Sequence, residues 1–515
     1  GLVSAGVAAA LGRRRLAAAL ARGLGSLAGF GREIRAGLRA GLAGDNRAHL
    51  LALAGVLAVA LAARLWFVNL PLRYDEATTF IEYASRPLAV GLSYYSAPNN
   101  HLFHTLLVGL GTRLFGESEA AIRLPALLAG WLAVAAAYLV FRLIHHRRAG
   151  LMAAALAAGC PILVEFAVNA RGYSLVTLLF LLLMALLAWL REHPHPAGWA
   201  VFAVLAALGL WSVPTMAYAL TTAAVWWLLA PPLGWGWGRR LNPLAAGLAG
   251  AAGLTLLLYA PVLLGTGWRS LANASGAANP APVFNLVWAF LRDALELTTR
   301  HWPAGAAWVL AGLGLWGALG HRRQQGRGAW WGWAALAGGL AVLLLLRSQP
   351  YPRIWLYLTP LILGAAGLGL ARLMARVGES AFAATALVLA AGLGLFAVLS
   401  PAIPASDQGG ALRDAAAIAE VMAARWRPGD AVLTACPADE PMAYQLRRRG
   451  LPVGAAFALL TGGLAPAKRI WVVSQPAGPT LADLLKNAGG QLKGCAPPQA
   501  VADFPEAALH LLTRQ

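Results

Sequence analysis

The sequence predicts a mainly α-helical, polytopic membrane bundle that carries a small C-terminal α/β domain. Hydrophobic residues make up 59% of the 515 residues and charged residues only 12%, whereas a soluble domain has about a quarter of its residues charged. The mean hydropathy is +0.62. Apolar stretches long enough to cross a bilayer recur from residue 48 to residue 400, and strand-like patterns follow only after them.

The net charge of +20 is explained by membrane topology. Arginine clusters recur in short loops between the apolar stretches, as the positive-inside bias requires. A nucleic-acid-binding protein would gather its basic residues on one face of a soluble fold. The charge therefore predicts no nucleic-acid partner.

Residues 1–47 are rich in arginine and alanine. Apolar residues recur at every fourth position, and arginines lie off that stripe: Phe30, Ile34, Leu38 and Leu42 against Arg32, Arg35 and Arg39. This pattern predicts a basic amphipathic helix on the anionic cytoplasmic leaflet. An unstructured basic leader is the alternative.

Eleven apolar segments within residues 48–401 are predicted to span the membrane, in a bundle with outer loops at 71–120 and 266–303. Their approximate limits are 48–70, 121–143, 149–167, 172–190, 197–213, 216–231, 243–265, 304–320, 329–346, 354–373 and 380–400. Arginine precedes the first segment and two carboxylates follow it, so the amino end lies inside. Two surface helices, 76–86 and 101–115, fit the pattern of the first outer loop.

The tail, residues 402–515, is predicted to be a small extracytoplasmic α/β domain, because an odd number of spans leaves it outside. DAVLTAC, RIWVVS and QAVADF are typical of strands, and DEPMAYQLRRRG and TLADLLKNAGG of helices. The alternation favours a parallel sheet. The tail contains no Gly-rich phosphate loop, so a lid, an acceptor platform or a docking module is expected. A disulfide between Cys436 and Cys495 stays open.

Two adjacent carboxylates, Asp75 and Glu76 in RYDEATTF, follow the first span. The chain has only 21 acidic residues, so a pair at a membrane exit is unusual. Asp75 is predicted to be a catalytic base, and Glu76 to orient an acceptor or a metal ion. The alternative is a solvated helix start, where acidic residues are favoured.

Two arginines at span ends, Arg171 in FAVNARGYSL and Arg353 in QPYPRIWLYLTP, are candidates for a phosphate clamp. Snorkelling to lipid headgroups is the alternative. On the same predicted face, His101 and Tyr357 are further candidates for binding the phosphate. Candidates for an acceptor-binding or structural role there are Asn99, Asn100 and Tyr173.

His101 is expected to bind a phosphate, to cap its helix, or to hold a divalent metal with Glu76 or Asp75. Glu119 and Arg123, spaced i,i+4, are expected to form a helix-entry ion pair.

These motifs resemble one superfamily when taken in order. The outer-loop Asp-Glu, the run APNNHLFHTLL, ExxxRLP from Glu119, ARGYSL and RxxxYLxP from Arg353 are similar to motifs of polyprenol-phosphate-dependent membrane glycosyltransferases of GT-C fold. The branch with protein O-mannosyltransferases and the lipid A aminoarabinose transferase is closest in pattern. The resemblance covers roughly residues 48–400. One departure is Asn-Asn-His-Leu, where many relatives carry a His-Pro-Pro-Leu-like or Lys-Pro-Pro-Leu-like run.

The resemblance implies a transferase at the outer face of the cell inner (cytoplasmic) membrane. Asp75 would be its base, a polyprenyl-phosphate-linked hexose or pentose its donor, and a lipid, glycan or protein its acceptor. Transfer would invert the anomeric carbon. The resemblance also implies a divalent metal in some members, and no nucleotide cofactor is expected.

Two other functions fit parts of the sequence. A lipid or solute transporter would place its ionisable residues at mid-membrane on interrupted spans, whereas the candidates here gather at one face. A non-catalytic assembly subunit on a transferase-like scaffold would explain the altered Asn-Asn-His run and the unassigned tail.

Overall fold

A computed structural model describes residues 2–230, 234–269, 271, 282–319, 330–346, 350–406, 410–452, 464, 467–476 and 478–515. The sequence HRRQQGR, predicted as an inner loop at 321–327, lies outside these ranges. The predicted outer loop 266–303 is described only in part.

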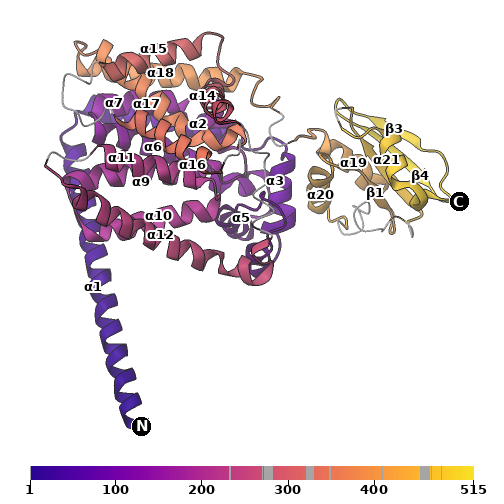
Figure 1. Cartoon of the computed structure of the whole chain (residues 1–515). Helices are drawn as coiled ribbons and strands as arrows, with labels where there is room; N and C mark the ends of the chain where they lie inside the picture. The colour runs from indigo at the N-terminus through magenta and orange to yellow at the C-terminus, as the bar shows by residue number, and fades with distance from the viewer. Residues whose placement is uncertain are drawn as a thin grey trace.

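Figure 1 shows a helical bundle with a small sheet unit beside it. The bundle helices are α2 (Arg47–Trp66), α6 (Glu119–Ile144), α7 (Arg147–Ala158), α8 (Pro161–Ala167), α9 (Tyr173–Glu192), α10 (Pro196–Ser212), α11 (Met216–Leu229), α12 (Trp237–Gly265), α15 (Ala306–Leu319), α16 (Trp330–Leu346), the 3-10 helix η3 (Pro352–Leu358), α17 (Thr359–Leu373) and α18 (Glu379–Leu399). Every predicted span contains one of these helices. The predicted fold class is therefore confirmed.

Within the described residues, six helices are long and apolar enough to cross a membrane. They are α2, α6, α9, α12, η3 with α17, and α18. The bent pair α7–α8 makes a seventh candidate. Helices such as α11, with 14 residues, rise only about 21 Å. Such helices are shorter than the hydrocarbon core, which is about 30 Å thick.

The break between α7 and α8 bends the span by 66°. Pro161 begins α8, because proline is tolerated at the first position of a helix but not in its interior. Arg64 of α2 is fully buried there, and its Nη1 donates to the carbonyls of Ala60, at 2.8 Å, and Ala158, at 3.0 Å. The positive charge of Arg64 at the C-terminal end of α7 interacts favourably with the negative end of that helix dipole.

The first outer loop folds into short helices that lie between the bundle and the sheet unit (Figure 1). They are α3 (Tyr74–Thr78), the π-helix η1 (Thr79–Ala84), α4 (Leu88–Ser93) and α5 (Leu102–Phe115). The two predicted surface helices correspond to α3–η1 and to α5. Helix α14 (Val283–Thr299) lies in the second predicted outer loop.

The C-terminal unit contains a four-stranded sheet in the order β1-β2-β4-β3. Its elements are α19 (Ala415–Arg425), β1 (Ala431–Leu433), α20 (Asp439–Arg448), β2 (Arg469–Ser474), α21 (Leu481–Ala488), the 3-10 helix η5 (Gly489–Leu492), β3 (Gln499–Asp503) and β4 (Ala508–Thr513). Only β1 and β2 pair in parallel, so the expectation of a parallel sheet was wrong. The short β3–β4 turn forces an antiparallel hairpin, whose β4 pairs antiparallel with β2.

Helix α20 attaches this unit to the outer loop. The ring of Tyr444 packs edge-on against Phe80, with centroids 5.9 Å apart, and its hydroxyl donates to the Glu117 carbonyl at 2.9 Å. Arg447 forms an ion pair with the Glu117 carboxylate at 2.7 Å. The unit therefore packs on the segment that carries the predicted base.

Helix α1 (Leu2–Ala43) leaves the bundle on the side away from the sheet unit and runs across the direction of α9 and α10 (Figure 1). Its predicted apolar stripe is divided between two environments. Phe30 is buried and stacks on His195, whereas Leu38 and Leu42 are exposed. Part of the stripe therefore packs on the bundle and does not face lipid.

Candidate active site

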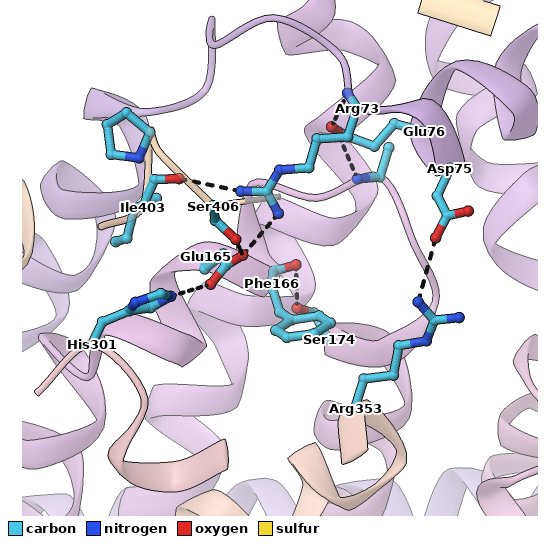
Figure 2. Close-up of polar contacts among 12 residues, drawn as sticks. Arg73, Asp75, Glu76, Glu165, Phe166, Ser174, His301, Arg353, Ile403 and Ser406 are labelled. Carbon is cyan, nitrogen blue, oxygen red and sulfur yellow. Dashed lines mark hydrogen bonds and ion pairs between the residues drawn. The ribbon is translucent and has the colours of Figure 1, made fainter. Parts of the chain in front are cut away.

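Asp75 lies in the first turn of α3. The backbone N–H of Arg73 donates to Glu76 Oε2 at 3.0 Å, so the helix start is fixed by a side chain in the capping-box manner. The Asp75 side chain, 18% exposed, accepts from Arg171 Nη1 and, at 3.5 Å, from Arg353 Nη1. Figure 2 shows Arg353 reaching Asp75. Three residues far apart in sequence thus meet at the Oδ2 oxygen of one carboxylate.

Tyr173 supports both guanidiniums. Its ring centroid lies 5.4 Å from the Arg171 guanidinium carbon and 5.7 Å from that of Arg353, and cation–π attraction offsets part of their repulsion. Burial, with the Arg353 charge adding to it, lowers the pKa of Arg171 to about 10. Arg171 therefore remains a cation at neutral pH.

His101 lies buried beside Arg171 and precedes α5. The Gly172 N–H donates to His101 Nδ1 at 2.8 Å, so Nδ1 is unprotonated and Nε2 carries the ring hydrogen. Burial lowers the pKa of His101 to about 3, and the charges of His104 and Arg353 act in the same direction. The ring is therefore neutral, with its Nε2 hydrogen 3.4 Å from Arg171 Nη2.

Several N–H donors around Asp75 lack an acceptor. Within the described ranges, nothing accepts from Arg171 Nε or Arg353 Nε, and His101 Nε2–H faces another donor. Unsatisfied buried donors are costly. An oxygen-rich anion such as a phosphate is the kind of acceptor that these donors lack.

Glu76 has a different environment from its neighbour and is fully buried. Arg123 donates from Nε to Oε1 at 2.8 Å and from Nη2 to Oε2 at 2.7 Å, and Ala170 N–H donates to Oε1 at 2.8 Å. Burial acts to raise the pKa of Glu76, but the Arg123 guanidinium holds it below its usual value.

The expected ion pair between Glu119 and Arg123 does not form. Arg123 lies on the inward face of α6 and reaches Glu76, whereas Glu119 pairs with Arg448 of α20 at 2.6 Å. Spacing alone predicted contact, but Arg123 faces Glu76 and the carbonyls of Val68, Leu70 and Pro71, whereas Glu119 faces α20.

Glu76 and His101, the two candidate metal ligands, do not fit a shared metal site. Both oxygens of Glu76 are occupied by Arg123 and by backbone N–H groups, and His101 Nδ1 accepts from Gly172. In the part of the chain that the structure describes, no three His, Cys, Asp or Glu side chains form a potential metal-binding group.

The remaining candidates divide into two sets. The Asn99 amide donates to the Asp75 backbone carbonyl at 3.2 Å and therefore lies at the site. Asn100 is structural, because its amide donates to the carbonyls of Gly91 and Tyr94, each at 2.9 Å. The Tyr357 hydroxyl lies 3.2 Å from Thr222 Oγ1, so its described contacts do not join it to Asp75.

Sequence reasoning missed Glu165. This buried carboxylate of α8 accepts from Arg73 at 2.9 Å, from His301 at 2.9 Å and from Ser406 at 2.6 Å (Figure 2). Arg73 also donates to the Ile403 carbonyl at 3.4 Å. The available signal was a lone glutamate within the apolar run PILVEFAV, where an ionisable residue is expected to have a partner or a function.

Part of the chain is similar to a known sequence family. Residues 99–264 match the family described as dolichyl-phosphate-mannose-protein mannosyltransferase. No curated protein matches the chain significantly.

Solved structures match over most of the chain. ArnT from Cupriavidus metallidurans in the apo state has a TM-score of 0.58 at 18% identity, covering 88% of this chain and 97% of that one. The same protein bound to undecaprenyl phosphate has a TM-score of 0.60 at 16% identity, covering 90% and 97%. The Archaeoglobus fulgidus oligosaccharyltransferase tethered with an acceptor peptide has 0.50 at 13%, covering 83% and 69%. The resemblance to the GT-C superfamily is thus confirmed at the level of the fold.

Proposed function

We propose that this chain, a membrane protein of GT-C fold, is a glycosyltransferase that moves a sugar from a polyprenyl phosphate to an acceptor. The observation that carries the proposal is Asp75 between Arg171 and Arg353, on a loop at one end of the bundle. Undecaprenyl phosphate bound to ArnT and the mannosyltransferase family match support a lipid-phosphate donor.

The site residues have separable roles in this reaction. Arg171 and Arg353 bind the donor phosphate as charged donors, and neutral His101 adds an uncharged N–H. Asp75 accepts the proton of the acceptor as the new glycosidic bond forms. Attack from the face opposite the phosphate inverts the anomeric carbon. Glu76 acts indirectly, because its contacts with Arg123 and Ala170 fix the turn that precedes Arg171.

In this proposal the reaction takes place outside the cytoplasm. The amino end then lies inside, and the tail lies outside at the outer face of the inner membrane. In this orientation the exposed basic residues Arg22, Arg32, Arg35 and Arg39 of α1 meet the anionic cytoplasmic leaflet. The acceptor in this proposal is a lipid, a glycan or a protein.

The broken span α7–α8 is a feature that transporters also show. In transporters the freed backbone groups at such a break bind the cargo. Here Arg64 donates to the Ala158 carbonyl at the break, so that carbonyl is already occupied. The broken span therefore supports a transport function less strongly than Arg171 and Arg353 support glycosyl transfer.

The first prediction concerns Asp75→Asn. This change removes the base but keeps the shape of the side chain, so transfer from a polyprenyl-phosphate sugar should fall by about 10²–10⁴-fold. Transfer should be measured in detergent with membrane extracts as the source of donor and acceptor. The variant should remain folded and should still bind undecaprenyl phosphate.

The neighbouring carboxylate supplies the control. Glu76→Gln breaks a buried ion pair, which costs about 3–5 kcal/mol, so it should lower the melting temperature. Asp75→Asn should lower the melting temperature less, because the Asp75 and Arg353 side chains are partly exposed. Full turnover by Asp75→Asn would reject Asp75 as the base.

A further inference from the structure

In the structure Asp75 is ion-paired with two arginines, and this pairing makes its carboxylate a weak base. Its Oδ2 oxygen accepts from both Arg171 Nη1 and Arg353 Nη1. Two guanidiniums at one carboxylate oxygen stabilise the anion and oppose its protonation. A base that must take a proton from an acceptor needs these contacts removed first.

A phosphate would be a better hydrogen-bonding partner than Asp75 for both guanidiniums. Arg171 Nε and Arg353 Nε are buried without an acceptor among the residues described. The two cations also flank the one Tyr173 ring, so they repel each other across a short distance. A phosphate offers several anionic oxygens to both, whereas Asp75 offers them one oxygen.

We propose that the donor phosphate displaces Asp75 from Arg171 and Arg353, so that the base becomes competent only when the donor lipid is bound. This switch rests on the proposed function. In the step that follows, the acceptor O–H oxygen bonds to the anomeric carbon and the bond from that carbon to the phosphate oxygen breaks. The bonding electrons leave with the phosphate, and the proton passes to Asp75.

The switch predicts an order of events. Without donor, Asp75 remains ion-paired and cannot activate an acceptor or a water molecule. With donor bound, the guanidiniums stabilise the charge that develops on the leaving phosphate. After transfer they stay on the lipid phosphate until it leaves, and their return to Asp75 releases its proton.

Glu76 offers a matched control within the same helix. Its partner Arg123 also donates to the carbonyls of Val68 and Pro71, each at 3.0 Å, and to that of Leu70 at 2.5 Å. These contacts hold Arg123 in place in addition to its pair with Glu76. A phosphate arriving at Arg171 should therefore change the environment of Asp75 and leave that of Glu76 unaltered.

The test uses the wild-type protein in lipid nanodiscs and a hydrophobic carbodiimide, which modifies protonated carboxyls. Peptide mass spectrometry quantifies the label on Asp75 and Glu76, with and without undecaprenyl phosphate. Saturating undecaprenyl phosphate should raise the Asp75 label about tenfold, the change that one unit of proton affinity gives. The Glu76 label should stay constant, and Asp75→Asn should remove the ligand-dependent signal.

The outcomes separate the switch from the function it rests on. If undecaprenyl phosphate raises the melting temperature but leaves the Asp75 label unchanged or lower, the switch is overturned and the transferase assignment stands. If undecaprenyl phosphate does not bind at all, the proposed function fails and the switch fails with it. A parallel rise at Glu76 would indicate general loosening of the site, which also overturns the switch.

Discussion

Asp75 and Glu76 are adjacent in the chain, yet their side chains meet opposite conditions. Glu76 is enclosed, with Arg123 on both of its oxygens, whereas Asp75 is partly open and touches two arginines that have other donors to spare. A buried pair such as Glu76–Arg123 is strongly destabilising to break. This difference supports the proposed division, in which Glu76 stabilises the fold of the outer loop and Asp75 acts as the base.

His101 leads to a prediction about pH. Its pKa is about 3 in the folded protein and 6.5 as an ordinary histidine, so the unfolded chain binds the proton more readily. The contribution of His101 to stability is complete above pH 6.5 and is lost as the pH falls toward 3. At pH 5 the loss is about 2 kcal/mol.

Melting temperatures at pH 7.5 and pH 5.0 check this expectation. The difference between the two should be smaller in His101→Gln than in the wild type, because glutamine does not titrate. Histidines that do not interact with His101 contribute equally to both proteins and cancel in the comparison, whereas His104, whose charge acts on His101, does not cancel. Equal acid sensitivity in the two proteins would contradict a neutral, buried His101.

At the scale of single residues, the sequence identified which charged residues were unusual more readily than it identified their ion-pair partners. Asp75, Arg171 and Arg353 stood out because charged residues at span ends are costly. The partner of Arg123 was missed because its choice depends on which face of α6 points inward. Glu165 was missed because its partners, such as His301 and Ser406, come from segments that pack against it only in the folded chain.

At the scale of elements, the contact of α20 with the outer loop can be tested by exchanging charges. Arg447→Glu would face Glu117 with a like charge, in place of a half-exposed pair worth roughly 0.2–1 kcal/mol. Amide exchange in residues 74–84 should then accelerate by up to about fivefold. The change reflects weaker packing of α20 on α3 and η1.

Exchanging both partners provides the control for the α20 contact. Glu117→Arg combined with Arg447→Glu restores opposite charges and should return amide exchange toward the wild-type rate. If the single variant exchanged as slowly as the wild type, the ion pair would have no part in holding α20.

The elements themselves were largely predictable, because apolar length and periodicity identify helices in a membrane protein. The break between α7 and α8 was not, since PILVEFAV continues an apolar run without a visible interruption other than Pro161. The mixed sheet was also missed. β4 (Ala508–Thr513) is short and partly exposed, so its periodicity is weak and its pairing depends on β2.

At the scale of the whole molecule, native cysteines report the orientation of the tail. Cys436 is exposed, and Cys160 is buried in the bundle. A membrane-impermeant maleimide added to intact spheroplasts should label Cys436, if the tail lies outside. The labelling should be done near pH 8.5, because partial burial of the Cys436 sulfur and nearby Asp439 raise the pKa of this thiol.

Cys436→Ser identifies the signal from Cys436, and permeabilised cells give the maximum label. Label that appears only after permeabilisation would place the tail, and with it the neighbouring Asp75 loop, in the cytoplasm. Such a result would contradict the orientation inferred from the arginine loops.

The cluster around Glu165 has a consequence for anyone who recombines this protein with its structural relatives. Ile403 and Ser406 belong by sequence to the tail, yet they bond to Arg73 and Glu165 of the bundle. A chimera joined at residue 402 would replace Ile403 and Ser406 with other residues. The buried Glu165 carboxylate would then lose its hydrogen bond from Ser406. A graft point beyond Ser406 keeps the contacts of Ile403 and Ser406 with the bundle. An exchanged tail would then have to reproduce only the contacts that α20 makes with Phe80, Glu117 and Glu119.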